Sequence, residues 1–544
     1  MKVKSSLRLP PPSRSIYKLA CVGLLTASAS LFAQEDPTSI YLKISENNTS
    51  LSLNKPSHWY TSEAGDTIYE GSFGENVDGF VNAAGKSALN TKVAGDASDV
   101  TFGNLTYQVT AARDNINLLQ IGGNRKLTIK NDFTFYYEIS DPWVEGTSYN
   151  PDSSFQCLKF RDKTSLSVGG NFIVDAYHYA KDPADYKELL FAFRNDAYND
   201  STKAEIAGHL IVSGTNIQFM NMLPTLNVGG VLSLDGNIFS YGSTYQHSSS
   251  EVKLGGLGNL DGSMGTGVLA HLAKTKEDNV INTSLTFTNS AKYDFKGTFL
   301  ALDDDTDINI NMNATDAKNG RQILRFETKE DSSHYVGHSN FGGGIAQETQ
   351  RIDNLNVIAG RLDLAMHEFM NVRNFKLDGT DAVFSATGLR INSEIGMLSM
   401  ETVELVKGKL VFDCSSTEND SIVITSDYQT TENENAGKLI ISNPSDVTFA
   451  LNLSDDLISE AEASEMLELV LISFESTNIT ASDIANINVE SNSDLYVTLK
   501  GVFSDDVLTG INAIVSTVAV PEPATVASLL GLFALAVAII RRRK

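Results

Sequence analysis

LSVGGNFIV, from Leu166 to Val174, is the stretch of sequence that indicates the fold. Apolar and polar residues alternate on both sides of a glycine pair, and Phe172 and Val174 stand two and four places after Gly170. Residues two apart in a strand point to the same face. The segment therefore predicts two short strands that meet at a glycine corner, each with one apolar face.

The same pattern recurs along the chain. It returns as LNVGGVLSL and LNVIAGRLDL, with partial copies AGHLIV, KGKLVF and AGKLII. The corner glycines are Gly170, Gly208, Gly230, Gly360, Gly408 and Gly437. Glycine tolerates the positive φ that a tight corner requires. The residues one and three places after the glycine are mixed, as with Arg361 and Asp363, so we expect them on a solvated outer face.

Repeats of about 20–30 residues built from short strands are typical of a β-solenoid, in which stacked coils bury one apolar column and asparagines stack in ladders. The predicted fold is all-β, an irregular right-handed parallel β-helix with capping regions and a single C-terminal transmembrane helix. Because the period is irregular, tandem β-sandwich domains remain the alternative.

The N-terminal segment, residues 1–33, is typical of a secretory signal peptide. It carries five cations and no acidic residue, and its apolar run LACVGLLTASASLFA is followed by the polar QEDP. Cleavage is expected after Ala33, where a small residue precedes the polar stretch. The segment predicts export through the general secretion machinery and removal by signal peptidase.

The last 25 residues, 520–544, have three parts. Prolines hold the stretch Val520, Pro521, Glu522 and Pro523 extended. Residues 524–540 form an uncharged run of 17 residues, just long enough for a helix to span a bilayer core of about 30 Å. The final cations are Arg541, Arg542, Arg543 and Lys544. Such a cluster stays on the cytoplasmic side, so the sequence predicts an exported body held transiently in the inner membrane.

This tail resembles the PEP-CTERM sorting signal of Gram-negative bacteria. The resemblance implies that an exosortase-type membrane protease recognises the Pro-Glu-Pro tripeptide and removes the tail, as with other discarded hydrophobic anchors. It also implies delivery to the cell surface or the extracellular matrix, in association with extracellular polysaccharide. The body is similar in pattern to the irregular β-helical passenger regions of autotransporter-type surface proteins.

Between the two ends we expect three regions. Residues 34–160 fit the repeat poorly and are interpreted as an N-terminal cap with the first coils, and 161–453 as the solenoid repeats. Residues 454–519 are interpreted as a C-terminal cap. It would contain one helix at 454–474, with Ser454 as its N-cap, a strand at 495–499 and a spacer at 501–519.

Charge and cysteine content narrow the function. The net charge is −25, and residues 34–519 carry 33 basic and 66 acidic side chains, a balance that argues against binding nucleic acid. Outside the signal peptide only Cys157 and Cys414 remain, and we expect buried or free thiols rather than a disulfide.

Catalytic and metal-binding motifs are not recognised in the sequence, so we expect neither an enzyme nor a bound cofactor. The acidic run 303–307 begins like a calcium loop but lacks its glycine, which leaves only weak calcium binding open. His334 and His338 lie in a loop-like stretch. The alternative function is a β-helix polysaccharide lyase or hydrolase, for which Asp363 and Asp378 are the candidate carboxylates. The favoured function is an exported structural or adhesive surface protein.

Overall fold

The structure is a computed structural model. It describes residues 37–43, 50–82, 90–93, 99–109, 116–139, 155–178, 189–195, 201–214, 217–243, 250–273, 283–301, 308–327, 351–366, 371–385, 397–416, 419–426 and 435–518. These residues belong to one compact unit, Pro37–Lys544. The predicted signal peptide with Ala33 and the predicted sorting signal, 520–544, lie outside them. Among the described residues no helix is long and apolar enough to cross a membrane, and the predicted span 524–540 is not among them.

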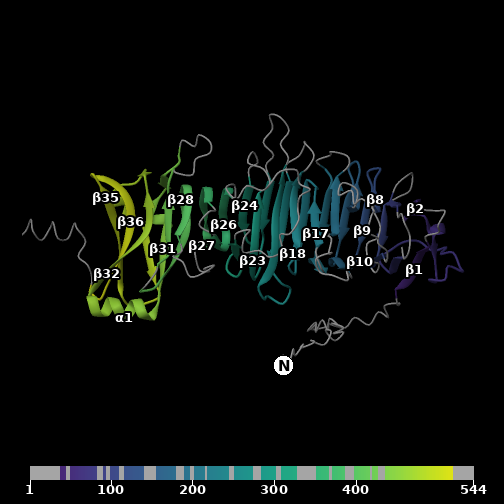
Figure 1. Cartoon of the computed structure of the whole chain (residues 1–544), viewed down its shortest axis with the longest axis horizontal. Helices are drawn as coiled ribbons and strands as arrows, with labels where there is room; N and C mark the ends of the chain where they lie inside the picture. Colours follow the sequence, from purple (N-terminus) through teal and green to yellow (C-terminus); the bar gives the residue numbers. More distant parts are fainter. Residues whose placement is uncertain are drawn as a thin grey trace, which may run out of the picture. The chain divides into compact units, whose positions relative to one another are not determined.

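Parallel pairing between strands far apart in sequence dominates the chain. Strand β10 (Phe133–Ile139) pairs in parallel with β7 (Leu105–Val109) on one side and β13 (Phe172–His178) on the other. The strands that follow, β11 (Phe155–Phe160) and β12 (Ser165–Val168), pair likewise with the strands three before and three after. Figure 1 shows the labelled strands running along the sheet from β1 and β2 at one end to β32, β35 and β36 at the other.

Three ladders of parallel strands result. The first holds β1 (Thr38–Lys43), β4 (Val77–Asn82), β7, β10, β13 and β16 (Leu210–Gly214). The second holds β2 (Ser50–Ser52), β5 (Asn90–Val93), β8 (Ile116–Ile121), β11, β14 (Leu189–Asn195), β17 (Ile217–Asn221), β19 (Ile238–Ser243) and β21 (Gly265–Ala273). The third holds β6 (Val100–Phe102), β9 (Lys126–Ile129), β12 and β15 (Lys203–Ile206).

Longer strands continue two of these ladders at once. Strand β18 (Thr225–Ser233) pairs with β15 near its start and with β16 near its end. The second ladder runs on through β23 (Lys292–Ala301), β25 (Arg321–Glu327), β26 (Arg351–Met366), β27 (Asn371–Ser385), β28 (Met397–Cys414), β31 (Val447–Leu453) and β34 (Asn488–Ser491). The third runs on through β18, β20 (Ser250–Leu257), β22 (Thr283–Phe287), β24 (Ile308–Asn313), β26, β27, β28, β30 (Lys438–Ile441) and β33 (Ser476–Thr477).

Antiparallel pairing is confined to the two ends of the described sheet. Near the start, β1 pairs with β3 (Trp59–Tyr60), which follows the short 3-10 helix η1 (Pro56–His58). Near the end, β36 (Val507–Ser516) lies between β32 (Met466–Phe474) and β35 (Tyr496–Ser504), while β32 also pairs in parallel with β29 (Ser421–Ile424). The predominance of parallel pairs confirms an all-β protein with a large parallel sheet and differs from the antiparallel pairing of β-sandwich domains.

The C-terminal region departs from the expectation in two places. Helix α1 begins at Asp455 with Ser454 as its N-cap, as predicted, but ends at Ser464, where Glu465 takes a left-handed conformation. Residues 466–474 form β32, because pairing with β29 and β36 overrides their helical pattern. The expected spacer at 501–519 is also wrong: it holds the end of β35 and all of β36, the central strand of the antiparallel end. A 3-10 turn, η4 (Pro444–Asp446), and a second short helix, α2 (Ala481–Ile484), complete the elements.

One hydrophobic cluster holds the described sheet together, with buried side chains from Ile40 to Val515. The apolar residues two and four places after each corner glycine are all buried, as predicted: Phe172, Val174, Leu210, Val212, Leu232, Leu234, Leu362, Leu364, Leu410, Phe412, Leu439 and Ile441. Aromatic rings stack within this core from coil to coil, with Phe219 5.5 Å from Phe191 and 5.9 Å from Phe239. Repeating contacts of this kind bury apolar area continuously from strand to strand.

Two corner glycines illustrate why the pattern needs glycine. Gly360 has φ +82, the left-handed conformation that the sequence pattern predicted. Gly208 does not need positive φ; a Cβ there would lie 2.5 Å from the carbonyl oxygen of Gly170. Gly208 instead donates its backbone N–H to that oxygen at 2.9 Å, and Gly230 donates to Gly208 in the same way. Close approach of successive corners therefore requires glycine here.

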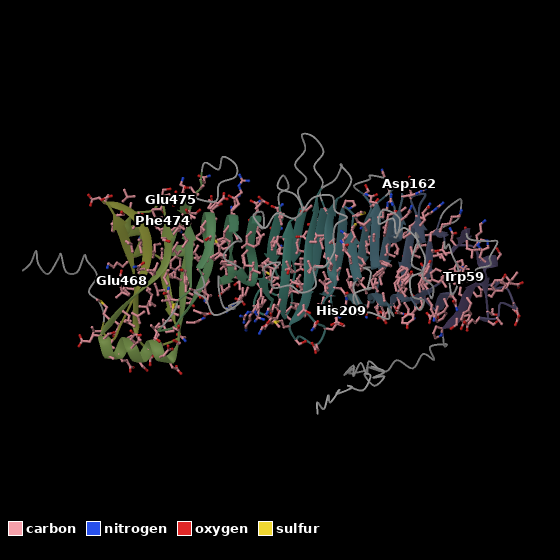
Figure 2. All side chains as sticks on the ribbon, in the orientation of Figure 1. Trp59, Asp162, His209, Glu468, Phe474 and Glu475 are labelled. Carbon is pink, nitrogen blue, oxygen red and sulfur yellow. The ribbon has the colours of Figure 1, made fainter. Side chains whose placement is uncertain are left out.

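A column of polar side chains runs beside these glycines. Asn171 Oδ1 accepts the backbone N–H of His209, and Asp132 Oδ1 accepts that of Asn171. The column continues toward the N-terminus through Asn104 and Asp78. His209 ends the row and is labelled in Figure 2. A second stack, Asn309, Asn354 and Asn374, joins the amides of successive strands. These contacts satisfy backbone groups that a turn would otherwise leave unpaired.

Candidate functional site

The candidate site is a set of charged residues on the neighbouring strands β23, β25 and β26. Lys292, Arg321 and Arg361 stand opposite one another in the second ladder. Two places further along, Asp294, Ile323 and Asp363 form the next row, and Lys296 stands opposite Arg325 in the row after that. Because adjacent strands lie about 4.8 Å apart, the cations of one row are close neighbours.

Asp363 is the centre of this set. Its side chain is 0% exposed, and its Oδ1 accepts from Nε of Arg361 at 2.6 Å while its Oδ2 accepts from Nε of Arg321. Both arginine side chains keep about a third of their surface exposed, at 31% for Arg321 and 30% for Arg361. The prediction that Asp363 lies on a solvated face is therefore wrong, since the two guanidinium groups and the neighbouring strands cover it.

A second ion pair lies beside the first. Arg325 Nη1 is 3.0 Å from Asp294 Oδ1, and the same guanidinium contacts the sulfur of Met264. Lys292 is exposed and Lys296 is half-buried. We call Lys292, Lys296, Arg321, Arg325 and Arg361 the basic strip. Lys292, Arg321 and Arg361 set three cations against the single carboxylate of Asp363, so this row of the strip is locally positive on a chain whose net charge is −25.

A different row of charges lies on the segments of β26, β27 and β28 that belong to the third ladder. Arg373 approaches two buried carboxylates, with Nη1 4.0 Å from Asp353 Oδ1 and Nε 3.7 Å from Glu401 Oε2. Asp353 Oδ2 also accepts the backbone N–H of Ile308 at 2.9 Å. The arginine lies between the two acids and attracts both, so this row joins three strands through ion pairs with buried carboxylates.

The two carboxylates that the sequence suggested for catalysis stand in different rows of the sheet. Asp363 stands opposite Ile323 and Ser385, whereas Asp378 stands opposite Lys407 and lies 3.8 Å from Lys376. Their rows are different, and each carboxylate has its own cationic partner. A glycoside hydrolase needs two carboxyl groups that face each other across one bond, and the register does not place these two in that relation.

Other predicted positions fall outside the described residues. They include the sorting residues Val520, Pro521, Glu522, Pro523, Arg541, Arg542 and Arg543, the cleavage residue Ala33, the acidic run 303–307 and the pair His334 and His338. No group of three or more metal-ligating side chains occurs in the described ranges, which leaves the run 303–307 untested as a calcium site.

Cys414 is a free, buried thiol. Burial raises its pKa to about 12, and the nearby carboxylates of Asp420 and Asp413 add to the shift. The expectation of a buried or free thiol is confirmed for Cys414, whereas the side chain of Cys157 lies outside the described part of the structure. A thiol with so high a pKa is protonated at neutral pH and is unreactive.

Most of the basic strip was not predicted from the sequence. Only Arg361 and Asp363 were singled out, through the repeat LNVIAGRLDL. The signal that could have found the others is the spacing of charges at every second or fourth residue in KYDFK and RQILR, which places them on one strand face. Bringing the three segments together requires the register of β23, β25 and β26.

No protein-family model matches this sequence, and no curated protein matches it.

Proposed function

We propose that this chain is an exported structural or adhesive protein of the cell surface or extracellular matrix, with an irregular right-handed parallel β-helix as its body. The observation that carries the proposal is the ladder register. From β1 to β34 the ladders are parallel, and most strands pair with strands two or three elements away, while β26, β27 and β28 pair with the next strand along the chain, around one apolar cluster. Such pairing is what a coiling chain produces.

The handedness follows from general chirality. Connections between parallel strands in one sheet are right-handed in about 98% of cases, because twisted strands and their crossovers pack back only that way. Antiparallel pairs at both ends, β1 with β3 and β35 with β36, support capping regions that close the ends of the ladders. A long ladder with outward-facing rows presents the same side-chain positions again and again, which suits adhesion and structural support.

The two termini supply the destination. A signal peptide at 1–33 directs export, and the segment Pro521, Glu522, Pro523 with residues 524–540 and the final arginines directs sorting by an exosortase-type membrane protease. The chain passes through the inner membrane and arrives at the cell surface or matrix without its tail.

Protease treatment of intact cells tests this location. A protease added from outside degrades the body of a surface protein while leaving a periplasmic marker intact. Degradation of the body supports the proposal. Protection of the body in intact cells, with degradation only after the outer membrane is opened, would place it in the periplasm and contradict the proposal.

A β-helix enzyme that lyses or hydrolyses polysaccharide is the second candidate. The carboxylates of Asp353 and Glu401 lie on neighbouring strands beside Arg373, but both are buried, so this row does not offer them to a polymer. The test is turnover of uronate and neutral polysaccharides by the purified chain, with and without calcium. Activity above a heat-killed control would replace the structural function by this one.

A further inference from the structure

We propose that the basic strip binds a linear polysaccharide that carries carboxylate or sulfate groups; the inference rests on the proposed surface location. The strip consists of Lys292, Lys296, Arg321, Arg325 and Arg361 on three adjacent strands. Elsewhere between residues 34 and 519, acidic side chains outnumber basic ones two to one. An anionic polymer is therefore repelled by most of the chain and attracted where these cations gather.

The two central arginines are held in place before any ligand arrives. Asp363 is fully buried and accepts one Nε–H from each of Arg321 and Arg361. A guanidinium has five N–H donors in a rigid fork, so one bond to Asp363 leaves the Nη groups for another acceptor. Among the described residues neither arginine has a second side-chain acceptor, and both remain partly exposed. Asp363 is thus a positioning residue, and the Nη groups are the ligand-binding atoms.

The spacing of the strip matches a narrow, extended anion. Lys292, Arg321 and Arg361 repeat at the strand separation of about 4.8 Å across the ladder, and Lys292 and Lys296 are four residues apart along one strand. The row of Lys292, Arg321 and Arg361 can therefore contact successive charged groups of a single extended chain. Asp294, between the rows, is an acceptor for hydroxyl groups, which a sugar polymer has in abundance.

Duplex nucleic acid fits the strip less well. A duplex carries one charge per 1.7 Å of its axis and is several strands wide, so its phosphates would extend beyond the strip on a chain whose net charge is −25. A polysaccharide with one charge per sugar or per two sugars has a lower charge density and a smaller width. Charge and width together favour the polysaccharide.

The test measures binding of the detergent-extracted full chain to immobilised alginate and dextran sulfate, with neutral dextran and duplex DNA as comparison ligands. The wild type is expected to bind both anionic polymers, with an affinity that falls as salt rises, and to bind neither neutral dextran nor DNA appreciably. Arg321→Gln with Arg361→Gln should weaken binding at least about tenfold, because two charge-assisted contacts are lost.

Two further variants keep the test decisive. Lys203→Gln with Lys253→Gln removes the same charge from β15 and β20, where each lysine pairs with a glutamate on its own strand, and should leave binding within about twofold. Lys292→Gln changes an exposed member of the strip without touching Asp363, and should weaken binding by a few-fold even if the double arginine variant fails to fold.

Three outcomes overturn the proposal: equal binding to neutral dextran, equal or tighter binding to DNA, or a loss of binding in the Lys203 and Lys253 control as large as in the strip variants. Failure of the strip is distinguishable from failure of the proposed function. A chain that is surface-exposed in the protease assay but binds no anionic polymer retains its location and loses only this ligand. A chain that binds the polymer but is protected in intact cells keeps this ligand and loses the proposed surface location.

Discussion

His209 accepts the backbone N–H of Val231 through Nδ1 at 2.9 Å, taking the place that asparagine and aspartate side chains occupy in the preceding coils. To accept this hydrogen bond Nδ1 must carry no proton. Burial also lowers the pKa of His209 below its ordinary value of 6.5. The folded chain therefore favours the neutral imidazole on both grounds.

This relationship predicts a pH dependence of stability. Because the folded pKa lies below 6.5, the unfolded chain binds the proton first as the pH falls, so the contribution of His209 is complete above the unfolded pKa and is lost as the pH falls through the folded pKa. His209→Asn keeps an acceptor for Val231 but does not titrate. We expect the wild type to lose more stability than His209→Asn between pH 7 and pH 5, measured by urea unfolding. Parallel pH profiles for the two proteins would contradict this role.

Gly208 tests the close stacking of corners. Gly208→Ala would place a Cβ 2.5 Å from the oxygen of Gly170 and 2.7 Å from Asn171 Oδ1. The coils must separate to admit the methyl group, and we expect a loss of about 1–3 kcal/mol or more in unfolding free energy. Gly74→Ala is the matched control, since nothing lies within 4 Å of its added Cβ. A Gly208→Ala protein as stable as the control would show that the corners are not in contact.

Phe219 tests the continuity of the core. Its ring is fully buried and lies 5.0 Å from Phe193 and 5.9 Å from Phe239, so it bridges successive coils. Phe219→Ala is expected to cost about 3–5 kcal/mol in unfolding free energy, because it leaves a cavity between coils. Phe503→Ala removes the same group from a position that is 53% exposed and should change stability by less than about 0.5 kcal/mol. Similar losses at both positions would be inconsistent with the core as described.

Asp363 and Asp378 test the ion pairs. Asp363→Asn removes a buried carboxylate from between two guanidiniums, and we expect a loss near the lower end of about 3–5 kcal/mol, since both arginines are partly exposed. Asp378→Asn removes a half-exposed carboxylate 3.8 Å from Lys376 and should cost no more than about 1 kcal/mol. Urea unfolding of both variants measures the difference. An Asp363→Asn variant as stable as the wild type would mean that the two arginines do not depend on this carboxylate for their positions.

The local pattern of the sequence was enough to predict the inner face of the sheet. The residues two and four places after each corner glycine are apolar for a reason that acts within one strand, so their burial followed from spacing alone. Ser454 as a helix N-cap was also predictable, because its side chain accepts from Leu457 three residues on. The reason for glycine at three of the corners was not predictable. Gly170, Gly208 and Gly230 do not have positive φ and are glycines because neighbouring coils approach closely there.

Features that depend on pairing between distant strands were not predictable. Residues 466–474 have a run of apolar residues that suits a helix or a strand, and the choice depends on the partners β29 and β36. The basic strip likewise arises from segments near residues 292, 321 and 361 that become neighbours only in register. Asp363 was expected in solvent because an alternating pattern gives the face of a residue but not what covers it.

The mass of the mature chain recovered from the cell surface tests the central claim most directly. The account predicts a chain that begins after Ala33 and ends near Pro523, without the apolar segment and without Arg541–Lys544. Intact-mass measurement, with sequencing of the C-terminal peptide, identifies that end. A surface-exposed chain that still carries Arg541–Lys544 would contradict sorting by removal of the tail.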